Sequence, residues 1–203
     1  TQFQIYIYIY FAFVLTFLLL GKSYAYEAKE DYLFEVQFGN LIVGKAEVSV
    51  ISDEKKIIVK AKTRTAGFLN TFYEYQGELI SISQENKEFW KPYKFTTKGL
   101  FNNKNRYSNL TWGPDKSVSY KLDPVLDLKE VHRIDKSSLI NVMDPLTSII
   151  NVIENIKNKK SCDQNFKIFD GRRRYDLKIK SLGEGILKND RPKSFSGHVI
   201  ICG

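Results

Sequence analysis

The chain is poor in the residues on which metal sites and nucleophilic catalysis depend. Its 203 residues include two cysteines, Cys162 and Cys202, and two histidines, His132 and His198. It has no Cys-x-x-Cys pair, Gly-x-Ser-x-Gly turn, His-Glu-x-x-His helix or phosphate-binding loop. These absences argue against a zinc site, a redox centre and the common nucleophilic hydrolases, so we expect no cofactor, no metal and no enzymatic activity. A hydrolase that uses two carboxylates is the enzymatic alternative.

Charge is nearly absent from the first 25 residues, which hold the one long apolar run of the chain, residues 3–20. The run is followed by Ser23-Tyr24-Ala25, a triplet with small residues at its first and third positions. This arrangement is typical of a secretory signal peptide, so we predict that residues 1–25 are removed by cleavage after Ala25. An uncleaved membrane anchor is the alternative. Because the chain begins with Thr1 and lacks a basic start, we expect a few preceding residues to be missing.

The remainder, residues 26–203, is long enough for a single domain with its own core. Removal of the signal peptide takes away Lys22 alone among the charged residues, which leaves 30 basic and 23 acidic residues and a net charge of +7. This excess predicts an anionic partner. Outside the cytoplasm such partners are phospholipid headgroups, lipopolysaccharide and acidic glycans, and we do not expect nucleic acid. A merely soluble surface is the alternative.

The two cysteines both lie in the exported part of the chain, where oxidation is possible. A Cys162–Cys202 disulfide is therefore expected. It would close a loop of about 40 residues and stabilise the fold by about 4 kcal/mol in the chain-entropy description.

Most of the chain alternates apolar and polar side chains with a period of two, which is the pattern of half-buried strands. In the first such run, Tyr32, Phe34, Val36 and Phe38 share one face. Short polar turns separate the runs, so neighbouring strands are expected to form antiparallel hairpins. We predict strands at residues 32–38, 42–50, 57–64, 72–83, 92–98, 106–112, 117–122, 166–168, 175–179 and 198–202, with a flexible loop over 123–140. Because the last strand runs on to Gly203, we expect the C-terminal end to be truncated.

One segment has a helical period. Asp144 is a good N-cap, Pro145 suits the first helical position, and lysines follow the apolar residues near the C-terminal end. We predict a helix over about residues 145–157. Its apolar stripe should pack against the sheet through Leu146, Ile149, Ile150, Ile153 and Ile156. The expected fold is mainly β, an antiparallel sheet with one amphipathic helix.

Several motifs resemble those of one protein family. They are residues 169–177 (Phe-Asp-Gly-Arg-Arg-Arg-Tyr-Asp-Leu), 144–147 (Asp-Pro-Leu-Thr), 43–46 (Val-Gly-Lys-Ala) and 65–67 (Thr-Ala-Gly). Cys162 and Cys202 lie on either side of the first of these motifs. Over about residues 30 to 202 the chain resembles an exported bacterial family catalogued as domain of unknown function 3108. The resemblance implies a periplasmic or envelope protein of a Gram-negative bacterium. It also implies a curved antiparallel sheet or open, incomplete barrel similar to lipoprotein carriers, but no active site.

The turn at Asp170-Gly171 leads into three consecutive arginines. Strand alternation would place Arg173 on one face with Tyr175, Leu177 and Ile179. Arg173 is therefore a candidate to bind an anionic headgroup bidentately at the rim of an apolar concavity. The alternative is a solvated hairpin in which Arg173 pairs with Asp176 or Glu184. The other face would carry a row of cations, here called the basic face: Arg172, Arg174, Lys178 and Lys180.

Aromatic residues are numerous, with 14 Phe and 12 Tyr. They could line a pocket for acyl chains, although such residues more often form the core. We expect a non-enzymatic periplasmic protein that binds a lipid, a lipoprotein or another amphipathic anion in the hollow of the sheet. The alternative is a structural or interaction protein of the envelope that contacts a partner protein or peptidoglycan through the basic face. The candidate ligand-binding residues, besides Arg173, are Phe34, Phe38, Tyr73, Tyr75 and Tyr175.

Overall fold

The computed structural model describes residues 28–86, 89–125, 134–188 and 194–203. The predicted signal peptide, residues 1–25, and the histidine at position 132 lie outside the described residues. In the described part of the chain, no helix is both long and apolar enough to cross a membrane.

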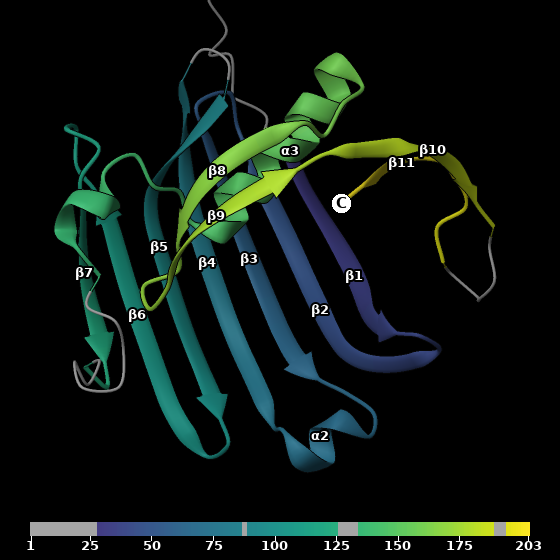
Figure 1. Cartoon of the computed structure of the whole chain (residues 1–203), viewed down its shortest axis with the longest axis horizontal. Helices are drawn as coiled ribbons and strands as arrows, with labels where there is room; N and C mark the ends of the chain where they lie inside the picture. The colour runs from purple at the N-terminus through teal and green to yellow at the C-terminus, as the bar shows by residue number, and fades with distance from the viewer. Residues whose placement is uncertain (1–27, 87–88, 126–133, 189–193) are drawn as a thin grey trace, which may run out of the picture.

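Seven strands form one antiparallel sheet in which each strand pairs with its neighbour in sequence (Figure 1). The strands are β1 (Ala28–Phe38), β2 (Leu41–Ser52), β3 (Lys56–Thr65), β4 (Tyr75–Asn86), β5 (Phe89–Phe101), β6 (Lys104–Trp112) and β7 (Val118–Asp123). The strand order is the same in space as in sequence, so β1 and β7 are the two ends and the sheet does not close on itself. The prediction of a mainly β fold with an antiparallel sheet is confirmed.

The other elements are short. The helix α3 (Pro145–Lys159) and the hairpin of β8 (Gln164–Phe169) with β9 (Arg174–Ile179) lie on one side of the sheet (Figure 1). The hairpin of β10 (Ser181–Leu187) with β11 (Gly197–Cys202) extends past the β1 end (Figure 1). A helical turn, α2 (Leu69–Phe72), joins β3 to β4, and a 3-10 turn, η1 (Lys136–Leu139), falls within the predicted loop. Because α3 contacts β4, β5 and β8, it fixes which side of the sheet is covered.

Strand alternation divides the sheet into two chemically different faces. The covered face, which packs against α3, includes Val59, Phe95 and Leu110, all almost fully buried. The open face is the opposite side and carries the alternate residues, among them Lys60, Ile80 and Thr96. Trp112 completes the covered face by donating a hydrogen bond from Nε1 to the carbonyl oxygen of Val142, at 2.8 Å. The core therefore lies between the sheet and the segment 139–169.

The helix α3 begins at the predicted residue. It is rotated about its own axis relative to the prediction, so a different side of it faces the sheet. Asp144 caps it, Pro145 is the first residue, and the helix ends at Lys159. Leu146 and Ile150 are buried, yet Ile149 is 53% exposed and Ile153 is 40% exposed. The prediction that these two isoleucines pack against the sheet is wrong. The buried positions beside Leu146 and Ile150 belong instead to Val152 and to three polar residues, Thr147, Ser148 and Asn151.

The rotation has a physical cause in a polar network between α3 and the sheet. Ser81 and Ser83 point from β4 into the core, and both hydroxyls lie within hydrogen-bond distance of Thr147 Oγ1, at 3.0 and 2.7 Å. Asn151 accepts a hydrogen bond from the Trp90 amide at 2.7 Å and donates to the Trp90 carbonyl at 2.9 Å. Buried polar groups of the sheet need partners, so the polar side of the helix turns toward them.

The predicted disulfide is confirmed between Cys162 and Cys202, whose Cα atoms are 6.0 Å apart. It links the start of β8 to the end of β11. Two strand predictions need correction. The strand expected from residue 72 begins at Tyr75, because residues 69–72 form a helical turn in which the Tyr73 amide donates to the Leu69 carbonyl at 2.9 Å. Strand β10 was not predicted, since its two glycines interrupt the alternation.

Candidate functional site

The main hollow of the sheet is a groove of about 680 Å³ on the open face, across β2 to β7. This size is within the usual range for a small-molecule site. Charged side chains of both signs border it, with cations in excess. The bordering residues are Lys45, Glu47, Lys62, Thr63, Arg64, Gln76, Gly77, Glu78, Lys98, Gly99, Leu100, Asn105, Arg106, Tyr107 and Asp123.

The strand register arranges these charges in two rows across the sheet. In one row the signs alternate, because Lys62 lies between Glu47 and Glu78, and Lys98 follows on β5. Opposite charges side by side on neighbouring strands attract each other, so the charges within this row neutralise one another. In the other row Lys45 lies directly opposite Arg64, with Gln76 next in line. The second row therefore carries uncompensated positive charge.

Internal ion pairs neutralise only part of this second row. Lys45 Nζ lies 3.3 Å from a carboxylate oxygen of Glu35 on β1. Within the described residues, Arg64 has no carboxylate oxygen within 4.0 Å. Like charges on adjacent strands repel one another, and an anion bound between Lys45 and Arg64 would relieve that repulsion.

Isoleucines gather on the open face beyond the alternating row. A smaller hollow of about 200 Å³ continues from the groove and shares Glu78 and Lys98 with it. Ile80 and Ile82 form its floor. Ile82 lies opposite Ile58, which in turn lies opposite Ile51 on β2. From the row of Lys45 and Arg64 the face thus continues across the alternating charged row to a patch of four isoleucines. Lys60 and Lys94 border this patch as the cross-strand neighbours of Ile80 and Ile82.

The distance between these two ends follows from strand geometry. On β3, Ile58 and Arg64 are six residues apart and share the open face. At about 3.4 Å per residue, the cationic row lies about 20 Å from the isoleucine patch. This length suits a molecule with a charged head and an extended hydrocarbon tail.

The predicted ligand residue Tyr75 lies on the covered face of the sheet, behind the strands that form the floor of the groove. Gly77 and Gly99 are cross-strand neighbours, and the Tyr75 ring occupies the space on the covered face that side chains at these positions would fill. The ring of the predicted residue Tyr73 packs edge-on against Phe101, with centroids 4.7 Å apart, and the Arg106 guanidinium lies 4.4 Å from the centre of that same ring. These aromatic residues thus support the sheet behind the groove.

The structure does not gather the other predicted ligand residues at the groove. Phe34 lies on the covered face of β1 opposite Ala46 and is 51% exposed, while Phe38 is at the tip of the β1–β2 hairpin. Tyr175 is on β9, across the sheet from the groove. Burial raises the pKa of Tyr175, as does Asp170 to a smaller extent, while Arg173 opposes this rise.

The arginine turn differs from the prediction because β9 begins only at Arg174. Arg172 and Arg173 lie in the turn, so strand alternation does not assign them to faces. The backbone amides of both donate to Asp170 Oδ1 at 2.7 Å. The side chain of Arg173 is exposed and makes no ion pair with Asp176, whose carboxylate lies 2.7 Å from Arg174 Nη1 instead.

Two members of the predicted basic face hold the hairpin in place. Arg172 donates to the backbone carbonyls of Asp123 and Pro124, at 3.0 and 3.2 Å. Burial lowers the pKa of Arg172, and so does the neighbouring Arg106. Arg174 donates to the Ser138 carbonyl, and its side chain is only 18% exposed. Lys178 and Lys180 are the exposed cations of this face.

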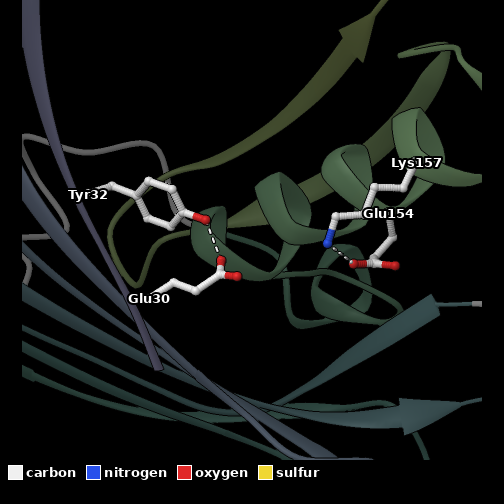
Figure 2. Close-up of polar contacts among 4 residues, drawn as sticks. All are labelled: Glu30, Tyr32, Glu154 and Lys157. Carbon is white, nitrogen blue, oxygen red and sulfur yellow. Dashed lines mark hydrogen bonds and ion pairs between the residues drawn. The ribbon is translucent and has the colours of Figure 1, made fainter. Parts of the chain in front are cut away.

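The edge strand β1 also carries charge toward the covered side. The Tyr32 hydroxyl donates a hydrogen bond to the Glu30 carboxylate, and Figure 2 shows the two side chains projecting from β1 together. This hydrogen bond is the main reason that the pKa of Tyr32 is raised. The β1 end of the covered face therefore combines exposed aromatic rings with an acid, which makes it a poor place for an anionic headgroup.

Comparison with known proteins identifies the family of the chain. A search of curated proteins and a search of solved structures each returned no match. A family model described as "Protein of unknown function (DUF3108)" matches residues 33–200. The match extends from β1 to β11 and includes the groove, α3 and the arginine turn. With most of its length matched, the chain belongs to the DUF3108 family.

Proposed function

We propose that this protein is a non-enzymatic, exported envelope protein that binds an amphipathic anion on the open face of its sheet. The acidic headgroup lies between Lys45 and Arg64, and the hydrocarbon tail lies over the isoleucine patch. The observation that carries this proposal is the order of side chains along the open face, cationic at one end and apolar at the other. The signal peptide predicted from the sequence supports export to the periplasm.

The alternative of a partner-binding basic face receives less support. Arg172 and Arg174 are engaged with backbone carbonyls and with Asp176. Only Lys178 and Lys180 of the predicted four stay exposed. A guanidinium already occupied within the fold is less able to bind a partner, so ligand binding on the open face is the preferred function.

The test compares palmitate with its uncharged analogue hexadecanol, using the oxidised full chain and a fluorescent fatty-acid displacement assay. Palmitate should bind, and Ile80→Thr should weaken it about tenfold, because about 1.4 kcal/mol of apolar contact corresponds to that factor. Phe34→Thr is the matched control, since Phe34 is also apolar and is more exposed than the half-buried Ile80, but lies on the covered face. It should leave binding unchanged.

A second variant tests the headgroup site. Arg64→Gln keeps a long polar side chain but removes the charge, so it should weaken palmitate and leave hexadecanol unaffected. The proposal is wrong if palmitate does not bind. It is also wrong if Phe34→Thr weakens binding and Ile80→Thr does not, because the ligand would then lie on the covered face.

A further inference from the structure

A second pocket, separate from the groove, lies where α3 meets β8 and the start of β5. Its volume is about 650 Å³, and it shares no residue with the groove on the open face. Its lining residues are Glu85, Phe89, Trp90, Met143, Asn151, Glu154, Asn155, Asn158, Lys159, Gln164, Asn165 and Phe166. The proposed function leaves this pocket without a role.

The chemistry of this pocket differs sharply from that of the groove. Five of its side chains are carboxamides, four asparagines and one glutamine, and three are aromatic rings. A carboxamide can donate and accept hydrogen bonds at once, as a hydroxyl group does. Aromatic rings offer flat apolar surfaces. Together they match a molecule that has hydroxyl groups at its edge and C–H groups on its faces, which is the chemistry of a sugar ring.

The charges of the pocket do not favour an anion. Glu85 and Glu154 line it with Lys159 as the only cation. The Glu154 carboxylate is already bound by Lys157, at 3.1 Å on the surface of α3 (Figure 2). A phosphate or a carboxylate would meet acidic side chains here, so the ligand class is neutral.

One buried acceptor in this pocket lacks a partner. Gln164 Oε1 is inaccessible to solvent and accepts no hydrogen bond from any residue that the structure describes. The amide cannot simply be reversed, because Gln164 Nε2 faces the Asn151 carbonyl oxygen at 3.4 Å and reversal would place two oxygens together. A buried acceptor without a donor is unfavourable by itself. The hydroxyl group of a ligand that displaces the side chains covering this oxygen would supply the missing donor.

We infer that this pocket binds a neutral saccharide, with its ring faces against Trp90, Phe89 or Phe166 and its hydroxyl groups on the carboxamides. Asn151 is fully occupied by the Trp90 backbone and by the Thr147 carbonyl, so it shapes the pocket and does not contact the sugar. The side chains of Asn158 and Asn165 make no hydrogen bond within the described residues and are the adaptable contacts. Gln164 Oε1 is the fixed acceptor.

The experiment uses the oxidised full chain and titrates it with diacetylchitobiose, cellobiose and maltotriose, followed by calorimetry and tryptophan fluorescence. The chain has two tryptophans, and Trp112 is buried in the core, so a ligand in the pocket should change the emission of Trp90. At least one of the three sugars should bind saturably. Gln164→Leu should then raise its Kd about tenfold, because the sugar hydroxyl loses its acceptor.

Gln84→Leu is the matched control, since Gln84 on β4 is exposed and is not one of the residues that line the pocket. It should leave sugar binding unchanged. Gln164→Leu removes an unpartnered buried acceptor and one long hydrogen bond, from Nε2 to the Asn151 carbonyl at 3.4 Å, so it should melt close to the parent chain. A melting temperature near that of the parent chain would show that a loss of binding does not come from misfolding. The inference is overturned if no sugar binds at millimolar concentration, if Gln164→Leu and Gln84→Leu bind alike, or if palmitate displaces the sugar and shows the pocket to be part of the lipid site.

Discussion

Asp144 offers the sharpest test of how α3 is held on the sheet. Its carboxylate is fully buried, has no cation beside it among the residues that the structure describes, and accepts four hydrogen bonds. The amides of Leu146 and Thr147 each donate at 2.9 Å, the Thr147 hydroxyl at 2.5 Å, and the Ser81 hydroxyl at 3.1 Å. Asp144→Ala would leave two buried amides without an acceptor. The two amides, unmet at about 1 kcal/mol each, and the Ser81 and Thr147 hydroxyls, at about 0.5 kcal/mol each, predict a loss of about 3 kcal/mol.

Asparagine at this position should behave differently, because burial raises the pKa of Asp144 and the four hydrogen bonds only partly oppose that rise. In Asp144→Asn the side-chain oxygen still caps the helix, and the Nδ2 group can donate to the Ser81 and Thr147 hydroxyls. The variant imitates the protonated acid. It should therefore lie within about 1 kcal/mol of the parent protein or exceed it in stability at neutral pH.

The pH dependence follows from the same shift. The folded protein keeps the Asp144 carboxyl group protonated up to a higher pH than the unfolded chain does. In the unfolded chain an aspartate titrates at about pH 3.9. Between that value and the folded pKa the native state binds more protons, so this residue makes the free energy of unfolding fall as pH rises. Relative to Asp144→Asn, the parent protein should lose stability over that window, and the difference should level off above the folded pKa.

Urea unfolding followed by tryptophan fluorescence, with the disulfide intact, measures all three proteins at about pH 4 and about pH 8. The reasoning is refuted if Asp144→Asn is destabilised as much as Asp144→Ala at neutral pH. That result would mean that the four donors require a charged acceptor and outweigh burial. It would also be refuted if Asp144→Ala lost under about 1 kcal/mol, since α3 would then not depend on its cap.

Two further predictions concern covalent and backbone constraints. Cys202→Ser should lower the free energy of unfolding by up to about 4 kcal/mol relative to the oxidised parent protein, measured by urea unfolding. The difference should vanish in reductant. Cys202 is exposed, so the serine hydroxyl adds no buried polar group. Gly171→Ala should cost about 3 kcal/mol, because its φ is +97° and the new Cβ would lie 2.8 Å from Ser108 Cβ in the core. Gly39→Ala, with φ +58° and no atom within 4 Å, is the control and should cost about 1 kcal/mol. Equal losses for the two glycine variants would contradict this.

The strands could be predicted because their signal is local. Strands β3 and β6 bury alternate residues against the core, so alternation within the sequence identifies them. Strands β2 and β3 match the prediction to within two residues at either end. The cap and proline of α3 and the pairing of two exported cysteines are local or compositional signals as well. Strand β10 lacks such a signal, since Gly183 and Gly185 leave no alternation to detect.

The groove could not be predicted because it depends on register. Lys45 and Arg64 are far apart in sequence and meet only because β2 and β3 pair with a particular offset. The sequence drew attention instead to consecutive arginines, which the structure places in a turn and uses to hold it. A cue was available in the lysines and isoleucines that alternate with the core residues of β3, since these must share the face opposite the core.

The rotation of α3 connects the core to the proposed saccharide pocket. A helix cannot bury Thr147 and Asn151 against β4 and β5 and also bury Ile149 and Ile153, which lie on another side of it. Asn151, Asn155 and Asn158 follow one another at spacings of four and three residues, so they form a single stripe along the helix. Once Ser81 and Ser83 have fixed the buried end of the helix, this stripe must face β8 and Gln164. The serines of β4 thus stabilise the fold and also position the carboxamides of the pocket.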